Sequence, residues 1–282
     1  MIRTLVSTDD LEVRLAKPDL VVLDVRHDLA KPDTWGEAQY NGGHIPGAIF
    51  VHLDRDLSGP KTGRNGRHPL PTPEDAAATF GRLGIGAGKE VVVYDQGGGV
   101  FASRLWWMLR WLGFADVAVL DGGYAKWSGE GRVVSEEATV PTPTEFRVGK
   151  VTPTVDVAGI AGSLARRALF IIDARGGERF RGETEPMDRV AGHIPGARNR
   201  PYTENLGAGN TFKSAAELRR EFEVLLDGAG VDSVVHQCGS GVSACHNILA
   251  MEVAGLSGTR LYPGSWSEWC ADPARPISIG SK

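Results

Sequence analysis

At residues 236–244 the chain reads His236-Gln237-Cys238-Gly239-Ser240-Gly241-Val242-Ser243-Ala244. A short apolar run at 233–235 precedes these residues, and a helix-like segment follows them to about Leu256. The pattern predicts a cysteine where a strand ends, in a loop of small residues ahead of a helix N-terminus. Backbone N–H groups converge at such a turn, and the helix dipole adds positive potential there. Both effects favour a thiolate, which is the nucleophilic form of cysteine. Cys238 is therefore the candidate nucleophile.

The alternative is a buried cysteine that packs as a small hydrophobic side chain, as most cysteines do. Gly239 and Gly241 argue against this interpretation. Glycines give up side-chain packing so that the backbone can wrap closely around a group. The loop composition therefore favours a cradle for an anion.

Bulk composition describes an ordinary water-soluble globular chain. Of its 282 residues, 41% are hydrophobic and 23% charged, and the net charge is −4, which gives no reason to expect nucleic acid or a membrane as a partner. Residues 1–10 lack an apolar core of signal-peptide length, and no run approaches the ~20 apolar residues of a membrane span. Three cysteines without a Cys-x-x-Cys pair suggest neither a disulfide framework nor a zinc site. We expect a reduced, cytoplasmic protein without a metal or organic cofactor.

The chain contains one module twice. An apolar run followed by Asp-x-Arg occurs at 20–26 and again at 169–175, and each is followed by Gly-His-Ile-Pro-Gly-Ala, at 43–48 and 192–197. The offset between these copies is 149 residues; further along, an offset of 142 pairs Gly99 with Gly241 and Trp127 with Trp269. The second offset places Gln96 opposite Cys238. The first copy thus lacks a nucleophile at this position, and we expect it to be catalytically silent.

A duplication of this length predicts two domains. We expect the first domain at residues 1–135, a Pro- and Thr-rich linker at 136–155 and the second domain at 156–282. Short apolar runs such as 91–94 and 117–120 alternate with amphipathic stretches, which predicts an α/β fold with mainly parallel sheets flanked by helices. Helix starts are expected at Thr72-Pro73 and Ser214. Sites in such sheets lie at the carboxyl ends of strands, where Cys238 falls.

Four kinds of chemistry could use Cys238. A thiol protease or amidase needs a histidine base; His236 is two residues away but fits an ordinary strand residue better. A Cys-x5-Arg phosphatase needs an arginine where this chain has Ala244. A redox pair with Cys245 would span about two helical turns, too far for a relaxed disulfide. Sulfur transfer through a cysteine persulfide needs only the thiolate, a cradle of N–H groups and room for one more sulfur atom.

The combination of motifs closely resembles the tandem-domain rhodanese family. It comprises the loop after Cys238, the two Gly-His-Ile-Pro-Gly-Ala motifs, both Asp-x-Arg starts and Gly-Ser-Trp-Ser-Glu-Trp at 264–269. The match runs from about Asp9 to Trp269. The family comprises thiosulfate and 3-mercaptopyruvate sulfurtransferases, so the resemblance implies two rhodanese-like domains, the second catalytic and the first inactive. In this chain Cys238 takes the role of the persulfide-forming residue, and the cradle is formed by Gly239, Ser240, Gly241, Val242 and Ser243.

The resemblance also implies substrate-binding residues. Arg179 matches the arginine of a Gly-Arg-Phe motif, and Arg189 approximates that of Pro-Glu-Pro-Arg, with a shift of about one residue. Two guanidinium groups would hold a carboxylate and a carbonyl. Ser240 would work with a histidine, for which His44 is the motif match, and with a carboxylate from Asp33 or Glu37. A structural role for His44 is an equal alternative, and His68 resembles a family segment beside the site without a defined role.

The sulfur donor follows from charge. Thiosulfate carries two negative charges near its transferable sulfur, and thiosulfate-type members have basic residues directly after the cysteine, where this chain has Gly239 and Ser240. The loop resembles the 3-mercaptopyruvate branch. We therefore expect sulfur transfer from 3-mercaptopyruvate to cyanide or a thiol, either a small thiol or a thioredoxin-like protein. The alternatives are a thiosulfate sulfurtransferase and a non-catalytic sulfur-relay or binding module.

Overall fold

The computed structural model describes residues 4–166 and 168–281. The chain forms two compact units, and each takes in a short segment from the other half of the sequence. The first unit contains residues up to 59, 71–152 and 207–212, and the second contains 60–70, 153–206 and 213 onward. The predicted limits of 135 and 156 remain predictions. Residues 60–70 and 207–212 are called arm 60–70 and arm 207–212 below.

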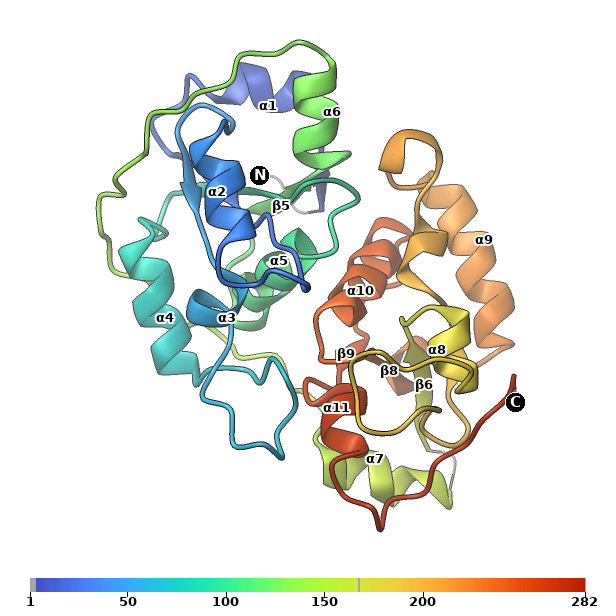
Figure 1. The fold of residues 1–282 in the computed structure, drawn as a ribbon. Helices are drawn as coiled ribbons and strands as arrows, with labels where there is room; N and C mark the ends of the chain where they lie inside the picture. The colour runs from blue at the N-terminus through green and yellow to red at the C-terminus, as the bar shows by residue number, and fades with distance from the viewer. Residues whose placement is uncertain (1–3, 167, 282) are drawn as a thin grey trace. The chain divides into compact units, whose positions relative to one another are not determined.

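The first unit is built on a fully parallel five-stranded sheet of order β1-β5-β4-β2-β3 (Figure 1). Its strands are β1 (Leu5–Val6), β2 (Leu20–Asp24), β3 (Ala48–Phe50), β4 (Glu90–Tyr94) and β5 (Val117–Leu120). Its helices are α1 (Thr8–Arg14), α2 (Trp35–Asn41), α3 (Leu53–Asp56), α4 (Pro73–Arg82), α5 (Ala102–Trp111) and α6 (Gly123–Gly129). Both faces of the sheet are covered, which explains why the central residues of its strands are apolar.

The second unit repeats this plan with four parallel strands in the order β7-β6-β8-β9. The strands are β6 (Phe170–Asp173), β7 (Arg198–Asn199), β8 (Val234–Gln237) and β9 (Arg260–Leu261). The helices are α7 (Val157–Leu164), α8 (Gly177–Arg181), α9 (Ala215–Leu226), α10 (Ser243–Val253) and α11 (Ser265–Trp269), with 3-10 turns η1 (Tyr202–Asn205) and η3 (Val231–Ser233); η2 (Ala208–Asn210) lies in arm 207–212. The predicted α/β fold with parallel sheets is confirmed.

Local signals explain where several elements begin. The Thr72 side chain accepts a hydrogen bond from the Asp75 N–H and Pro73 opens α4, while Ser214 accepts from the Glu217 N–H at the start of α9. Both predicted helix starts are confirmed. In each unit one face of the sheet carries a continuous apolar cluster, centred on Val92 in the first and Val235 in the second.

The segment expected as a linker has no helix or strand, but hydrogen bonds fix it to the first unit. The N–H groups of Thr144, Gly149 and Thr152 donate to backbone carbonyls of Gly81, Leu112 and Trp111, and Phe146 is buried. Residues 136–152 therefore pack as part of the first unit. No helix among residues 4–166 and 168–281 is long and apolar enough to cross a membrane.

Candidate active site

Cys238 follows the last residue of β8, at the carboxyl edge of the second sheet. Its N–H donates to Ser265 Oγ at 3.1 Å, and its carbonyl accepts from the Trp266 N–H at 3.0 Å. The Gly239 carbonyl accepts from the Ser267 N–H at 2.9 Å. The first turn of α11 thus fixes the loop, and the Cys238 side chain is only 2% exposed. The predicted strand–loop–helix placement of the cysteine is confirmed.

Gly241 of the loop is required by the backbone around it, and Gly239 leaves room for two side chains. Gly241 has φ +77°, and a Cβ there would lie 2.3 Å from the Pro263 carbonyl oxygen. A Cβ on Gly239 would lie 2.7 Å from Nη2 of Arg67 and 3.5 Å from Nη2 of Arg179. Two guanidinium groups therefore rest directly on the backbone beside Cys238. Val242 is buried at the end of the loop, and Ser243 is the first residue of α10.

The strand register identifies the counterpart of Cys238 in the first unit. The aspartates of the two Asp-x-Arg motifs pair with the last residues of β4 and β8, as Asp24–Tyr94 and Asp173–Gln237. The next residue in each chain segment is Asp95 in the first unit and Cys238 in the second. The expected pairing of Gln96 with Cys238 is wrong, because the first loop is one residue longer than the second and the offset of 142 holds only beyond it.

The Asp95 carboxylate shows what this loop binds. It accepts backbone N–H groups at 2.8–3.3 Å from Gly97, Gly99, Phe101 and Ala102. Burial raises the pKa of Asp95 to about 6, although these four hydrogen bonds pull it down. The loop of the silent unit is therefore an anion cradle filled by its own side chain, which supports the same role for the related loop around Cys238.

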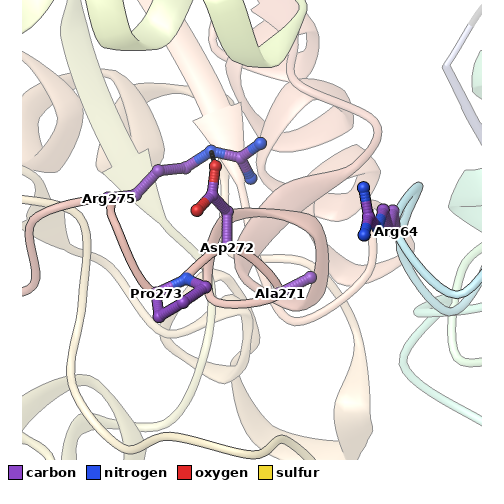
Figure 2. Close-up of a pocket in the computed structure, with 5 residues that line it drawn as sticks. All are labelled: Arg64, Ala271, Asp272, Pro273 and Arg275. Atoms are coloured by element: carbon purple, nitrogen blue, oxygen red, sulfur yellow. Dashed lines mark ion pairs between the residues drawn. The ribbon is translucent and has the colours of Figure 1, made fainter.

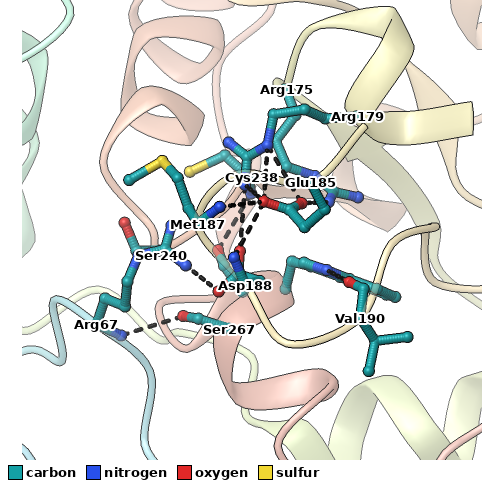
Figure 3. Close-up of polar contacts among 12 residues, drawn as sticks. Arg67, Arg175, Arg179, Glu185, Met187, Asp188, Val190, Cys238, Ser240 and Ser267 are labelled. Atoms are coloured by element: carbon teal, nitrogen blue, oxygen red, sulfur yellow. Dashed lines mark hydrogen bonds and ion pairs between the residues drawn. The ribbon is translucent and has the colours of Figure 1, made fainter. Parts of the chain in front are cut away.

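An alternating network of charges surrounds Cys238 (Figure 3). Arg175 forms an ion pair with Asp173 at 2.8 Å and contacts Glu185 at 3.4 Å, and Glu185 accepts from Arg179 at 2.7 Å. Asp188 then accepts from Arg179 at 3.2 Å and from Arg67 of arm 60–70. Burial lowers the pKa of Arg175, but Asp173, Glu185 and the Cys238 thiolate raise it more, so the pKa is raised overall. Arg175 thus stays charged, and a negative sulfur at Cys238 interacts favourably with it.

Glu185 and Asp188, two carboxylates of this network, differ in the direction of their pKa shifts. Burial raises the pKa of Glu185, but the hydrogen bonds from Arg179 and from two backbone N–H groups together lower it by more. The pKa is therefore lowered overall, and Glu185 is held in its ionised form. For Asp188 burial outweighs Arg67 and Arg179, and its pKa is raised. The network contains three arginines and three carboxylates, so its formal charge is zero before the thiolate is counted.

The predicted arginines fall in different places. Arg179 lies over the loop, whereas Arg189 is exposed and does not lie against Gly239. The second guanidinium over Gly239 belongs to Arg67, which sequence reasoning missed. Nothing in the local sequence marks Arg67, because its place follows from arm 60–70 packing with the second unit.

The predicted relay residues also separate. His44 belongs to the first unit and is fully buried, with Nδ1 2.8 Å from the Tyr40 carbonyl and Nε2 3.1 Å from the Glu137 carbonyl. This geometry favours the structural alternative for His44, and Asp33 is exposed on the first unit. The histidine that contacts the loop is His68, whose Nδ1 lies 2.7 Å from Ser240 Oγ.

His236 does not act as a base in this site. Burial alone lowers its pKa to about 3, so the ring is neutral, and neither nitrogen has a partner among the described residues. Cys245 and Cys270 are buried free thiols; Cys245 Sγ lies 3.4 Å from the Gly241 carbonyl oxygen. No group of three His, Cys, Asp or Glu side chains that could hold a metal ion occurs in the described part of the chain.

A separate hollow of about 240 Å³ lies at the end of α11 (Figure 2). It is lined by Arg64, Ala271, Asp272, Pro273 and Arg275. Cys238 is not among these residues, and the carboxylate of Asp272 pairs with Arg275 at 3.7 Å, so the hollow is separate from the chemistry of the site.

Comparison with known proteins agrees with this geometry. The Rhodanese-like domain model matches residues 7–130 and 160–272. A Pseudomonas aeruginosa protein named as a probable 3-mercaptopyruvate sulfurtransferase is 45% identical over 98% of both chains. A Mycobacterium tuberculosis protein named as a candidate thiosulfate sulfurtransferase is 40% identical over 92% of this chain and 91% of the other. The structure of a 3-mercaptopyruvate sulfurtransferase from Leishmania major has 31% identity and a TM-score of 0.81, over 95% of this chain and 74% of the other.

Proposed function

The chain belongs to the rhodanese-like family, and on that premise we propose that it is a sulfurtransferase that takes sulfur from 3-mercaptopyruvate through a Cys238 persulfide. One observation carries the choice of donor. The cations of the site, Arg67 and Arg179, lie over Gly239 from outside the loop, where they suit a carboxylate at a distance from the sulfur.

The first half-reaction is a displacement at sulfur. The Cys238 thiolate attacks the sulfur of 3-mercaptopyruvate, an S–S bond forms, and the C–S bond breaks with its electron pair going to carbon. The products are a persulfide that carries the thiol proton of the donor and the enolate of pyruvate. The persulfide then gives up this proton to become an anion, and the enolate becomes pyruvate when it takes up a proton. The Ser240 hydroxyl, hydrogen-bonded to His68, supplies that proton in this proposal.

Binding and charge stabilisation fall to the arginines. Arg67 and Arg179 orient the donor carboxylate, and their fork geometry suits bidentate contacts. Nε of Arg67 is buried without a hydrogen-bond partner among the described residues. Arg175 and the N–H groups of the loop stabilise the persulfide anion.

The second half-reaction regenerates the thiolate. Cyanide attacks the outer sulfur and leaves as thiocyanate, or a thiol acceptor takes this sulfur as its own persulfide. The acceptor in the cell is a small thiol or a thioredoxin-like protein in this proposal, and the cell compartment is the cytoplasm. Three free thiols without a disulfide support a reducing compartment.

Thiosulfate is the second candidate donor, favoured by the name of the M. tuberculosis relative. Comparing kcat/KM for the two donors with cyanide as acceptor tests the choice. We expect a clear preference for 3-mercaptopyruvate, because the charged network around Cys238 is neutral and offers little to a dianion. A preference for thiosulfate would reverse the assignment.

Replacing the nucleophile tests the enzyme against a non-catalytic module. Cys238→Ser should lose transfer from either donor and should no longer gain one cyanide-removable sulfur atom in the intact mass. Cys245→Ser is the matched control, because it removes another buried thiol and should keep the mass gain. Turnover in Cys238→Ser above background would contradict the proposal.

A further inference from the structure

Asp188 is a carboxylate that contacts both donor-binding groups. It bridges Arg67 and Arg179, the two guanidinium groups that lie on Gly239 beside the nucleophile. Its side chain is only 4% exposed, and its N–H donates to Glu185 at 3.1 Å, which fixes the segment that carries it (Figure 3). Asp188 therefore sets the charge that a bound donor meets.

The charge balance depends on this residue. Glu185 is engaged by Arg179 and Arg175, and Asp173 by Arg175. Asp188 is the one remaining carboxylate of the network, and it offsets the charge of Arg67. Without it the network would carry one net positive charge, and that charge would lie at the guanidinium groups over the loop.

We propose that Asp188 is a specificity-determining residue that makes the site prefer singly charged sulfur donors over doubly charged ones. This inference rests on the proposed sulfurtransferase function. A monoanionic donor gains from one guanidinium contact and meets a nearly neutral surrounding. A dianion such as thiosulfate brings a second negative charge. No positive charge is left to balance it, because Asp188 already offsets the charge of Arg67. In a partly buried site an unmatched charge is costly.

Asp188→Asn tests the inference, because asparagine keeps the shape and one oxygen acceptor but removes the charge. With cyanide as acceptor, kcat/KM for thiosulfate should rise about tenfold or more, while that for 3-mercaptopyruvate should change by less than about threefold. Inorganic sulfate, an inert dianion, should inhibit Asp188→Asn about tenfold more strongly than the wild type.

Two variants separate charge from structure. Glu183→Gln removes a negative charge from the same segment, but Glu183 is exposed and pairs with Arg181, so this change should leave the donor ratio unchanged. Asp188→Glu keeps the charge and should keep the preference for 3-mercaptopyruvate. The inference is overturned if Asp188→Asn changes both donors equally or neither, or if Glu183→Gln shifts the ratio as much. If the wild type turns over no 3-mercaptopyruvate, the proposed function is wrong, and the inference that rests on it is wrong as well.

Discussion

At the scale of single residues, the leaving group decides what the protein must supply. With 3-mercaptopyruvate the leaving group is the enolate of pyruvate, which is strongly basic and needs a proton. With thiosulfate the leaving group is sulfite, which is a stable anion and needs none. Ser240 and His68, 2.7 Å apart, are the proton source in our proposal. The contribution of Ser240 and His68 to kcat/KM should therefore depend on the donor.

Ser240→Ala should lower kcat/KM for 3-mercaptopyruvate roughly 100-fold, within the range of general-acid contributions, and should change that for thiosulfate far less. Ser257→Ala, at a surface serine bonded to Glu252, is the control. An equal loss for both donors would assign Ser240 to the structure of the loop instead of proton transfer.

Asp95 gives a prediction for stability against pH. Its pKa is about 6 in the folded chain and near 3.8 when unfolded, so the folded state holds the proton more tightly between these values. The contribution of Asp95 to stability is therefore full below the lower value and is lost as pH rises through about 6. We therefore expect the stability of the wild type to fall between pH 5 and pH 7, and that of Asp95→Asn to fall less. Thermal unfolding of both proteins at the two pH values measures this difference. An identical pH dependence in both proteins would contradict this account.

At the scale of elements, the turn from β8 to α10 depends on glycine for two separate reasons. Gly241 has a left-handed backbone, and its missing side chain leaves room for the Pro263 carbonyl. Gly88 has nearly the same φ, +78°, but open space around it. The pair separates backbone strain from steric overlap.

Gly88→Ala should cost about 1–2 kcal/mol from the left-handed conformation alone. Gly241→Ala should cost well beyond that and abolish sulfur loading of Cys238, because the loop or α11 must move. Thermal unfolding and intact mass after donor treatment measure the two effects. Similar melting temperatures for the two variants would show that the overlap at Pro263 is relieved without cost.

Elements and their order could be predicted from this sequence because their signals are local. The apolar strands, the caps at Thr72 and Ser214, and the loop around Cys238 each occupy a few consecutive residues. The counterpart of Cys238 cannot be placed to the residue from the sequence, since the glycines of the first loop allow the one-residue insertion to be aligned in more than one way. The strand register resolves this, and a sequence alone does not contain it.

At the scale of the whole molecule, the candidate site draws on residues far apart in the chain. Arg67 and His68 come from arm 60–70, about 170 residues before the loop they contact. Arm 207–212 belongs to the first unit in the same way, with the Phe212 N–H donating to Asp121 at 2.8 Å. No periodicity or motif spacing predicts such contacts, so Arg67 and His68 could not be assigned before the packing was known.

This organisation predicts that the second half of the sequence is insufficient by itself. A polypeptide of residues 153–282 keeps Cys238 and Arg179 but lacks Arg67 and His68. It should turn over 3-mercaptopyruvate at least about 100-fold more slowly than the full chain. The double variant Arg67→Gln/His68→Gln in the full chain is the control for folding and should show a comparable loss. Normal turnover by residues 153–282 would show that arm 60–70 is dispensable.

The filled cradle of the first unit also fixes a stoichiometry. Because the Asp95 carboxylate already occupies the N–H groups that would hold a sulfur anion, only one of the two related loops can be loaded. Intact mass after donor treatment should therefore show a gain of one sulfur atom per chain. The rapid burst of pyruvate should amount to one equivalent, and the slower release that follows reflects transfer to the thiol of the donor itself. The two-domain architecture thus yields a carrier of one sulfur atom per molecule, and its burst amplitude counts the active chains in a preparation.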